Sequence, residues 1–220
     1  MAEASSVTIY DLTEAGRPMW MRFAMEPVFE FNKFWPFSSA TSLSAGQGLV
    51  LFGAPVVGYP GHLDGGLHAV SFAGDKLSRY SSQVAYGGSE SAVVHRNLSF
   101  IQLGTLPAIV STDVYAVAMT VLPDAPIDVA TGLQVPTIAV GTNGGVSVIK
   151  HDGTVANSQA WPINNVAFDG QGNVVNAGEN GRNYCKALAP DLLQRSQLCR
   201  GSIIASRVHQ HDQFGIYDKG

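Results

Sequence analysis

The sequence has little charge: only 14% of its 220 residues are Asp, Glu, Lys or Arg, against roughly 25% in an average soluble domain. The formal net charge is −4. A general binder of the nucleic-acid backbone needs a positive surface, so this balance argues against nucleic acid as a partner. The low charge also excludes a highly charged disordered tail and a helical bundle rich in Glu and Lys.

Cysteine and long apolar runs are scarce as well. Cys185 and Cys199 are the only cysteines, whereas a zinc ribbon needs four ligands at tighter spacings. Residues 1–11 contain no basic stretch followed by an apolar run, so we expect no secretory signal. Without such a signal, two reduced thiols are favoured over a disulfide between neighbouring strands. No window of eighteen apolar residues occurs, so we expect no membrane insertion.

Glycine, in contrast, is abundant, with 24 residues. Short runs of Val, Ile, Thr and aromatic residues are cut by Gly, Asn and Asp, which is typical of strands joined by turns. The clearest stretch, residues 136–154, predicts strands at 137–142, 146–150 and 154–158. Asn143-Gly144 and residues 151–153 are the predicted turns between them, because Asn-Gly and Asp-Gly supply positive φ angles.

The same layout recurs at residues 48–80 and 172–196. Asn143 and Asn180 are 37 positions apart, and Gly66 and Gly145 are 79 apart, which leaves room for one degenerate unit between them. Residues 115–122 and 163–168 are plausible first strands of their units. A four-stranded antiparallel unit recurring at about 40 residues predicts an all-β, propeller-like array of blades, with a β-sandwich as the alternative fold.

Stacked blades cover one another's faces, which fits the low charge. Four units fit between Thr41 and Cys199. Closed propellers have at least about four blades, so we expect a few-bladed or an incomplete ring over residues 41–220.

Residues 1–40 differ from the blades because they concentrate aromatic and Met side chains. One interpretation makes this segment the opening strand and closing element of the first blade. The other makes it an arm that docks on another subunit, since such side chains dominate interface cores. The interface residues predicted on the second interpretation are Met19, Trp20, Met21, Phe23, Phe29, Phe31, Phe34, Trp35 and Phe37.

Two strings carry a resemblance to a known family. Residues 10–23 (YDLTEAGRPMWMRF) and residues 117–154 (VAMTVLPDAPIDVATGLQVPTIAVGTNGGVSVIKHDGT) resemble WD-repeat-like propeller chains of tailed bacteriophages, described as tail, fibre or other virion components. The resemblance covers about a quarter of the chain closely and the remainder by blade layout. It implies a virion protein that is assembled in the host cytoplasm.

Candidates for chemistry are few. His209, His211 and Asp212 could place two imidazoles and a carboxylate on one strand, but a polar surface strand is favoured over a metal site. His62, Asp64 and His68 lie around a Gly-rich insertion, for which we favour an exposed loop over a pocket. Ser91 and His95 lack the nucleophile-elbow context of a hydrolase. Asp124 and Asp128 are interpreted as solvated turn residues rather than calcium ligands. We therefore expect no catalytic residue and no cofactor.

The leading hypothesis is a non-enzymatic structural or attachment component of a phage particle. Its partners would be other virion proteins, further copies of itself and possible receptors on the host surface. The alternative is a propeller enzyme, a lactonase-like hydrolase or a lyase, whose site is built from His62, His68, His209 and His211.

Overall fold

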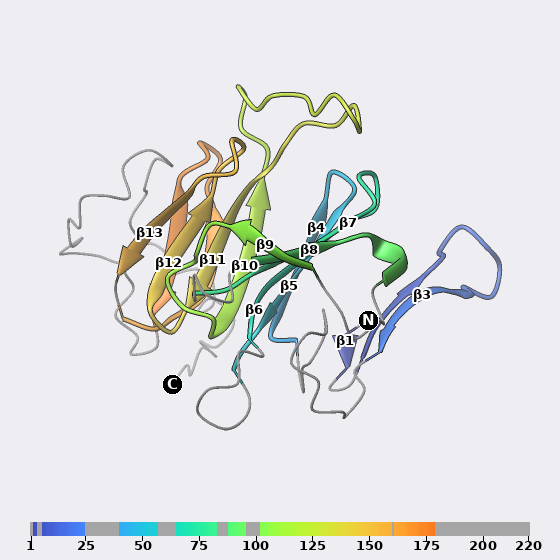
Figure 1. The fold of residues 1–220 in the computed structure, drawn as a ribbon, viewed down its shortest axis with the longest axis horizontal. Helices are drawn as coiled ribbons and strands as arrows, with labels where there is room; N and C mark the ends of the chain where they lie inside the picture. The colour runs from blue at the N-terminus through green and yellow to red at the C-terminus, as the bar shows by residue number, and fades with distance from the viewer. Residues whose placement is uncertain are drawn as a thin grey trace, which may run out of the picture.

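The fold of the chain is all-β and antiparallel in this computed structural model (Figure 1). The structure describes residues 2–3, 6–24, 40–56, 65–82, 88–95, 102–159 and 161–178. Within these ranges the strands form four sheets, which do not close into a ring of blades. The N-terminal sheet contains β1 (Ala2–Glu3), β2 (Ser6–Tyr10) and β3 (Met19–Ala24), and the six-stranded sheet contains β4 (Ser42–Gly46), β5 (Leu49–Ala54), β6 (Gly66–Ser71), β7 (Lys76–Tyr80), β8 (Gly88–Ser91) and β9 (Gln102–Leu106). The four-stranded sheet contains β10 (Val114–Thr120), β11 (Thr137–Thr142), β12 (Gly145–Ile149) and β13 (Val155–Gln159). The last sheet is the hairpin of β14 (Ile163–Phe168) and β15 (Val174–Gly178).

The four-stranded sheet β10–β13 confirms the predicted unit at residues 115–158. Its strands pair in sequence order, as in a meander. The turn at residues 151–153 is also confirmed, with Gly153 at a φ of 81°. Within the β14–β15 hairpin, the predicted strand at 163–168 is present too.

The turn between β11 and β12 lies where Asn143-Gly144 predicts it, but the expected backbone angles are wrong. Positive φ occurs at the next residue, Gly145, with a value of 129°, and at neither residue of the pair. The Thr142 hydroxyl closes this turn instead: it accepts a hydrogen bond from the Gly144 N–H (3.1 Å) and donates one to the Gly145 carbonyl (2.9 Å). The hairpin therefore has its positive φ one residue later than predicted, at the glycine directly after the pair.

The degenerate unit expected between the first two repeats is not a separate blade. The strands found there, β8 and β9, extend the first sheet to six strands, with β8 pairing along β7. Because β8 pairs with β7, the backbone N–H and C=O groups of β7 are hydrogen-bonded; they would be unpaired if β7 were the edge of its sheet. The even period of about 40 residues therefore does not hold across this region.

Sheets stack face to face, and alternate residues of one strand enter different cores. On β5, Leu51 packs toward the four-stranded sheet, while Phe52 packs toward the N-terminal sheet. On β11, Val140 faces the six-stranded sheet and Ala139 faces β14 and β15. Since both faces of these sheets are covered at their centre, the strands β5, β6, β11 and β12 are buried along most of their length, as in sheets buried on both sides.

The first interpretation of residues 1–40, as the opening strand of the first blade, is wrong for β3. The six-stranded sheet begins with β4, while β3 pairs with β2 in a sheet of its own. Phe23 of β3 is fully buried against Phe52, with the ring centroids 6.2 Å apart. The N-terminal sheet thus covers the outer face of the six-stranded sheet, where a preceding repeat would otherwise lie.

Candidate functional site

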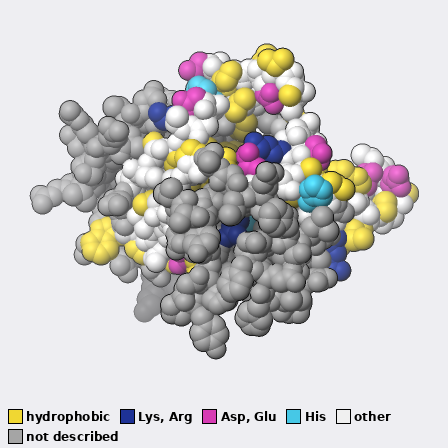
Figure 2. Space-filling model, in the orientation of Figure 1, with side chains coloured by type: hydrophobic (Ala, Val, Ile, Leu, Met, Phe, Trp, Pro, Cys, Tyr) yellow, Lys and Arg dark blue, Asp and Glu magenta, His cyan; other side chains and the backbone are white. Residues whose placement is uncertain are grey.

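One candidate site is the end of the β2–β3 hairpin, which extends away from the stacked sheets (Figure 1). Four large hydrophobic side chains are exposed there: Tyr10 (41%), Leu12 (74%), Met19 (58%) and Trp20 (56%). Figure 2 shows hydrophobic side chains next to acidic ones on this projection. We call these four residues the hairpin tip. Clustered exposed apolar side chains of this kind typically mark an interaction surface.

The loop between the two strands is held by Asp11. Its carboxylate accepts hydrogen bonds from the Thr13 N–H (2.8 Å) and the Thr13 hydroxyl (2.6 Å), which lower the pKa of Asp11. The Asp11 N–H in turn donates to the Pro18 carbonyl (2.9 Å). A loop fixed by its own hydrogen bonds has less conformational entropy to lose on binding, so the hairpin tip is preorganised.

The predicted interface residues separate into three groups. Met19 and Trp20 lie in the hairpin tip, where the Trp20 ring also contacts Phe72 at a centroid distance of 5.0 Å. Phe23 is fully buried and Met21 is partly buried against the core of the same chain, so both anchor the hairpin. The others, namely Phe29, Phe31, Phe34, Trp35 and Phe37, lie outside the described residues.

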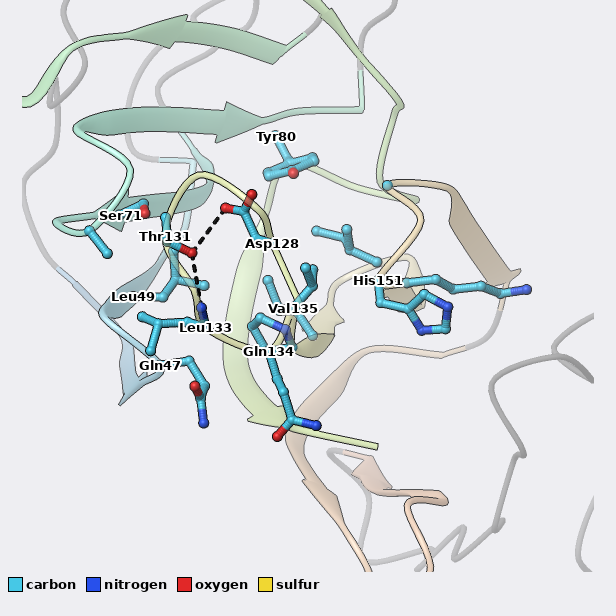
Figure 3. Close-up of a pocket in the computed structure, with 16 residues that line it drawn as sticks. Gln47, Leu49, Ser71, Tyr80, Asp128, Thr131, Leu133, Gln134, Val135 and His151 are labelled. Carbon is cyan, nitrogen blue, oxygen red and sulfur yellow. Dashed lines mark hydrogen bonds between the residues drawn. The ribbon is translucent and has the colours of Figure 1, made fainter. Parts of the chain in front are cut away.

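A second candidate site is a pocket along the seam between the six-stranded and four-stranded sheets (Figure 3). Its volume is about 220 Å³. The long connection between β10 and β11, residues 121–136, forms one wall. The aliphatic lining comes from Leu49, Leu133, Val135, Ile138 and Ile149, and polar groups come from Gln47, Tyr80, Asp128, Gln134, Lys150 and His151. We call this the seam pocket.

Asp128 organises the wall of the seam pocket. Its carboxylate accepts hydrogen bonds from the Ala130 N–H and the Thr131 hydroxyl, each at 3.0 Å, and the second of these is drawn in Figure 3. Its own N–H donates to the Leu133 carbonyl (2.8 Å). Asp128 is therefore a turn residue, as the sequence indicates, and its oxygens hold the loop.

Two polar groups of the pocket stand out electrostatically. Burial, with a further contribution from the charge of Glu90, raises the pKa of Tyr80 to about 12. The Nδ1 atom of His151 is buried and has no hydrogen-bond partner within the described part of the chain. A buried polar atom without a partner costs free energy.

The raised pKa of Tyr80 gives a pH dependence. In the unfolded chain Tyr80 loses its proton near its ordinary pKa of 10.0, whereas in the folded chain it keeps the proton to about pH 12. The folded state then binds more protons than the unfolded state, so stability falls as the pH rises through this window. Two pH units correspond to about 2–3 kcal/mol. Urea unfolding between pH 9 and 12 should show a steeper loss for the wild type than for Tyr80→Phe, and equal slopes would contradict this assignment.

Several predicted chemical residues can be placed. His68 is a fully buried residue of β6, so the expected exposed loop is wrong for it: its strand is enclosed between two sheets. The Ser91 hydroxyl lies 3.0 Å from His95 Nδ1, on the exposed surface. No group of three metal-ligating side chains occurs among the described residues. The remaining candidates, His62, Asp64, Cys185, Cys199, His209, His211 and Asp212, lie outside the described residues.

The seam pocket itself is not predicted from the sequence. Its signal is the length of the β10–β11 connection, since the matching connection between β4 and β5 is the two-residue turn Gln47-Gly48. That contrast is visible only once the strands of the two units are aligned.

Among the helices of the described residues, none is long and apolar enough to cross a membrane.

No protein-family model matches the sequence, and no curated protein matches it significantly.

Proposed function

We propose that this chain is a non-enzymatic structural component of a larger particle, in which stacked sheets form a rigid scaffold and the hairpin tip docks on another subunit. The observation that carries the proposal is the division of the hairpin into two ends. Phe23 is buried at its base, while Met19 and Trp20 are exposed at its tip. An anchored, preorganised projection with an apolar end has the features expected of a docking element.

We further propose that the sheets are blades of a propeller-like array. In support, β10 packs between β4 and β14, so the first strands of three successive units adjoin one another. The bulge near the start of β10, between Val114 and Ala116, recurs at the start of β14, between Ile163 and Asn165. A bulge repeated at the same place is expected of equivalent repeats.

The particle that we propose is a tailed-phage virion, with other virion proteins or further copies of this chain as partners. This part rests on the resemblance of residues 10–23 and 117–154 to phage propeller chains. The first of these strings includes the whole hairpin tip. The resemblance and the docking element therefore fall on the same segment.

Replacing Trp20 by alanine is expected to weaken assembly without unfolding the chain. An aromatic residue at the centre of an interface contributes about 2 kcal/mol or more, which corresponds to a roughly 30-fold rise in the dissociation constant. Light scattering of the purified protein over a concentration series measures this change. Val129→Ala is the matched control, because Val129 is 98% exposed on a different loop.

Two results would contradict the proposal. A wild-type chain that remains at its monomer mass of 23.3 kDa at all concentrations would reject self-assembly through the hairpin tip. If the wild type and Trp20→Ala form assemblies of the same mass, the interface lies on another surface of the chain.

A further inference from the structure

The strand β13 (Val155–Gln159) is the last strand of the four-stranded sheet, on the left of that sheet in Figure 1. Within the described residues it pairs with β12 alone, and no strand lies along its second edge. Natural proteins usually protect such an edge with charges, proline or a bulge. The sequence VANSQ has no charge and no proline, and the β12–β13 register has no shift. The second edge of β13 is therefore suited to pairing with a further strand.

The hydrogen-bond pattern shows which backbone groups of β13 point away from β12. The Lys150 N–H donates to the Thr154 carbonyl (2.9 Å), directly before β13 begins. Along an antiparallel ladder, hydrogen-bonded pairs alternate with pairs that are not hydrogen-bonded. Counted from Thr154, Ala156 and Ser158 bond to β12, so the N–H and C=O groups of the other three residues point outward. These residues are Val155, Asn157 and Gln159, with Asn157 in the middle.

The side chain of Asn157 fixes the strand without using these outward groups. Its Oδ1 atom accepts a hydrogen bond from the Ser147 hydroxyl (2.7 Å), and its Nδ2 atom donates one to the Ala108 carbonyl (3.0 Å). Asn157 is nevertheless exposed. Because the strand is already held in place by its own chain, little conformational entropy is lost when a second strand pairs with it.

Two complementary features lie at the opposite ends of β13. Trp161, two positions after the strand, is 71% exposed. Gly153, two positions before the strand, lies in the β12–β13 turn, where an added Cβ atom would have no neighbour within 4 Å. Antiparallel pairing of two identical strands brings opposite ends together. The large exposed ring of one copy would then lie beside the open turn of the other.

We propose that β13 pairs antiparallel with β13 of a second copy of this chain, around a two-fold axis at Asn157. In this register Asn157 lies opposite its own counterpart and Val155 lies opposite Gln159, so every outward N–H and C=O group of the two strands is paired. Trp161 of each copy lies against the Gly153 turn of the other. No like charges meet, because β13 has no charged residue. A self-complementary contact of this kind closes as a dimer.

This interface is distinct from the hairpin tip and does not depend on the function proposed for it. The test therefore uses the full chain carrying Trp20→Ala, so that association through the hairpin tip is weakened. Sedimentation velocity over a concentration series should show a dimer of twice the chain mass of 23.3 kDa. The paired surface is small, so we expect a dissociation constant on the order of 10 μM.

Charges at position 157 test the two-fold axis directly. Asn157→Asp and Asn157→Lys each place like charges opposite one another, so each variant alone should dimerise about fivefold more weakly. A mixture of the two places opposite charges across the axis and should associate about tenfold more tightly than either variant alone. Asn165→Asp is the matched control, because Asn165 is exposed on β14 and should leave the dimer unchanged.

Trp161→Ala tests the contact at the strand ends and should weaken the dimer about 30-fold, as loss of a central aromatic side chain does. The proposal fails if the Trp20→Ala chain stays monomeric up to about ten times the expected dissociation constant. It also fails if the mixture of Asn157 variants associates no more tightly than its components. A dimer that weakens in Trp161→Ala but is insensitive to charge at position 157 would contradict the strand pairing.

Discussion

Replacing Phe23 by alanine is expected to lower the free energy of unfolding by about 3–5 kcal/mol, the usual cost of removing a buried phenylalanine. Phe23 is fully buried and packs with Phe52, Val70 and Leu77 between the N-terminal and six-stranded sheets. Truncation leaves a cavity where these two sheets meet. Urea unfolding of the full chain measures the change.

The control is Tyr10→Ala, an aromatic truncation in the same hairpin. Tyr10 is 41% exposed, so its loss should lower the free energy of unfolding by no more than about 1 kcal/mol. Hydrogen exchange adds a local readout, because the amides of β2 and β3 should lose protection in Phe23→Ala. A loss of less than about 1 kcal/mol would mean that the N-terminal sheet does not cover this face in solution.

Phe23 also shows where reasoning from the sequence reaches its limit. The aromatic and Met side chains of residues 19–37 form one group in the sequence, and one of the two interpretations assigns most of them to an interface. In the structure, position along the hairpin separates them: Met21 and Phe23 pack toward the core, while Met19 and Trp20, nearer the hairpin end, are exposed. Composition detects apolar side chains, but only strand pairing shows which face is covered.

The fold was predictable where local chemistry decides it. The strand at 137–142 follows from its β-branched residues, and the turn at 151–153 follows from its Asp-Gly pair; both signals act within a few residues. The assignment of β8 and β9 was not predictable, because the choice between extending a sheet and starting a new one depends on long-range pairing. The burial of His68 depends on the same long-range packing.

The seam pocket was missed for a related reason. Its lining comes from segments as distant in sequence as Leu49, Tyr80 and His151, none of which forms a recognisable motif. The stacking of two sheets brings them together, and the 121–136 loop completes the wall. A site formed between two repeats leaves one signal in the sequence, which is a longer loop in one of the repeats.

Replacing Gly141 by alanine is expected to destabilise the chain by about 1–3 kcal/mol, as overpacking of a close contact does. A Cβ atom at Gly141 would lie 2.8 Å from the Ile163 carbonyl oxygen and 3.1 Å from Val166 Cγ1. The first of these neighbours is backbone and cannot rotate away, so β14 must move. The φ of Gly141 is not positive, and the cost therefore comes from packing between sheets.

Gly170→Ala is the matched control, because a Cβ there has no neighbour within 4 Å and its φ is not positive. That substitution should be neutral or stabilise the chain by up to about 1 kcal/mol, since alanine restricts the unfolded chain. Opposite signs for the two variants in thermal unfolding would support the close approach of β11 and β14. Gly53, where a Cβ would lie 2.8 Å from Val114 Cγ1 at the start of β10, should behave like Gly141. If all three variants stabilise the chain equally, the sheets are not stacked at these glycines, and the proposed propeller-like arrangement loses this support.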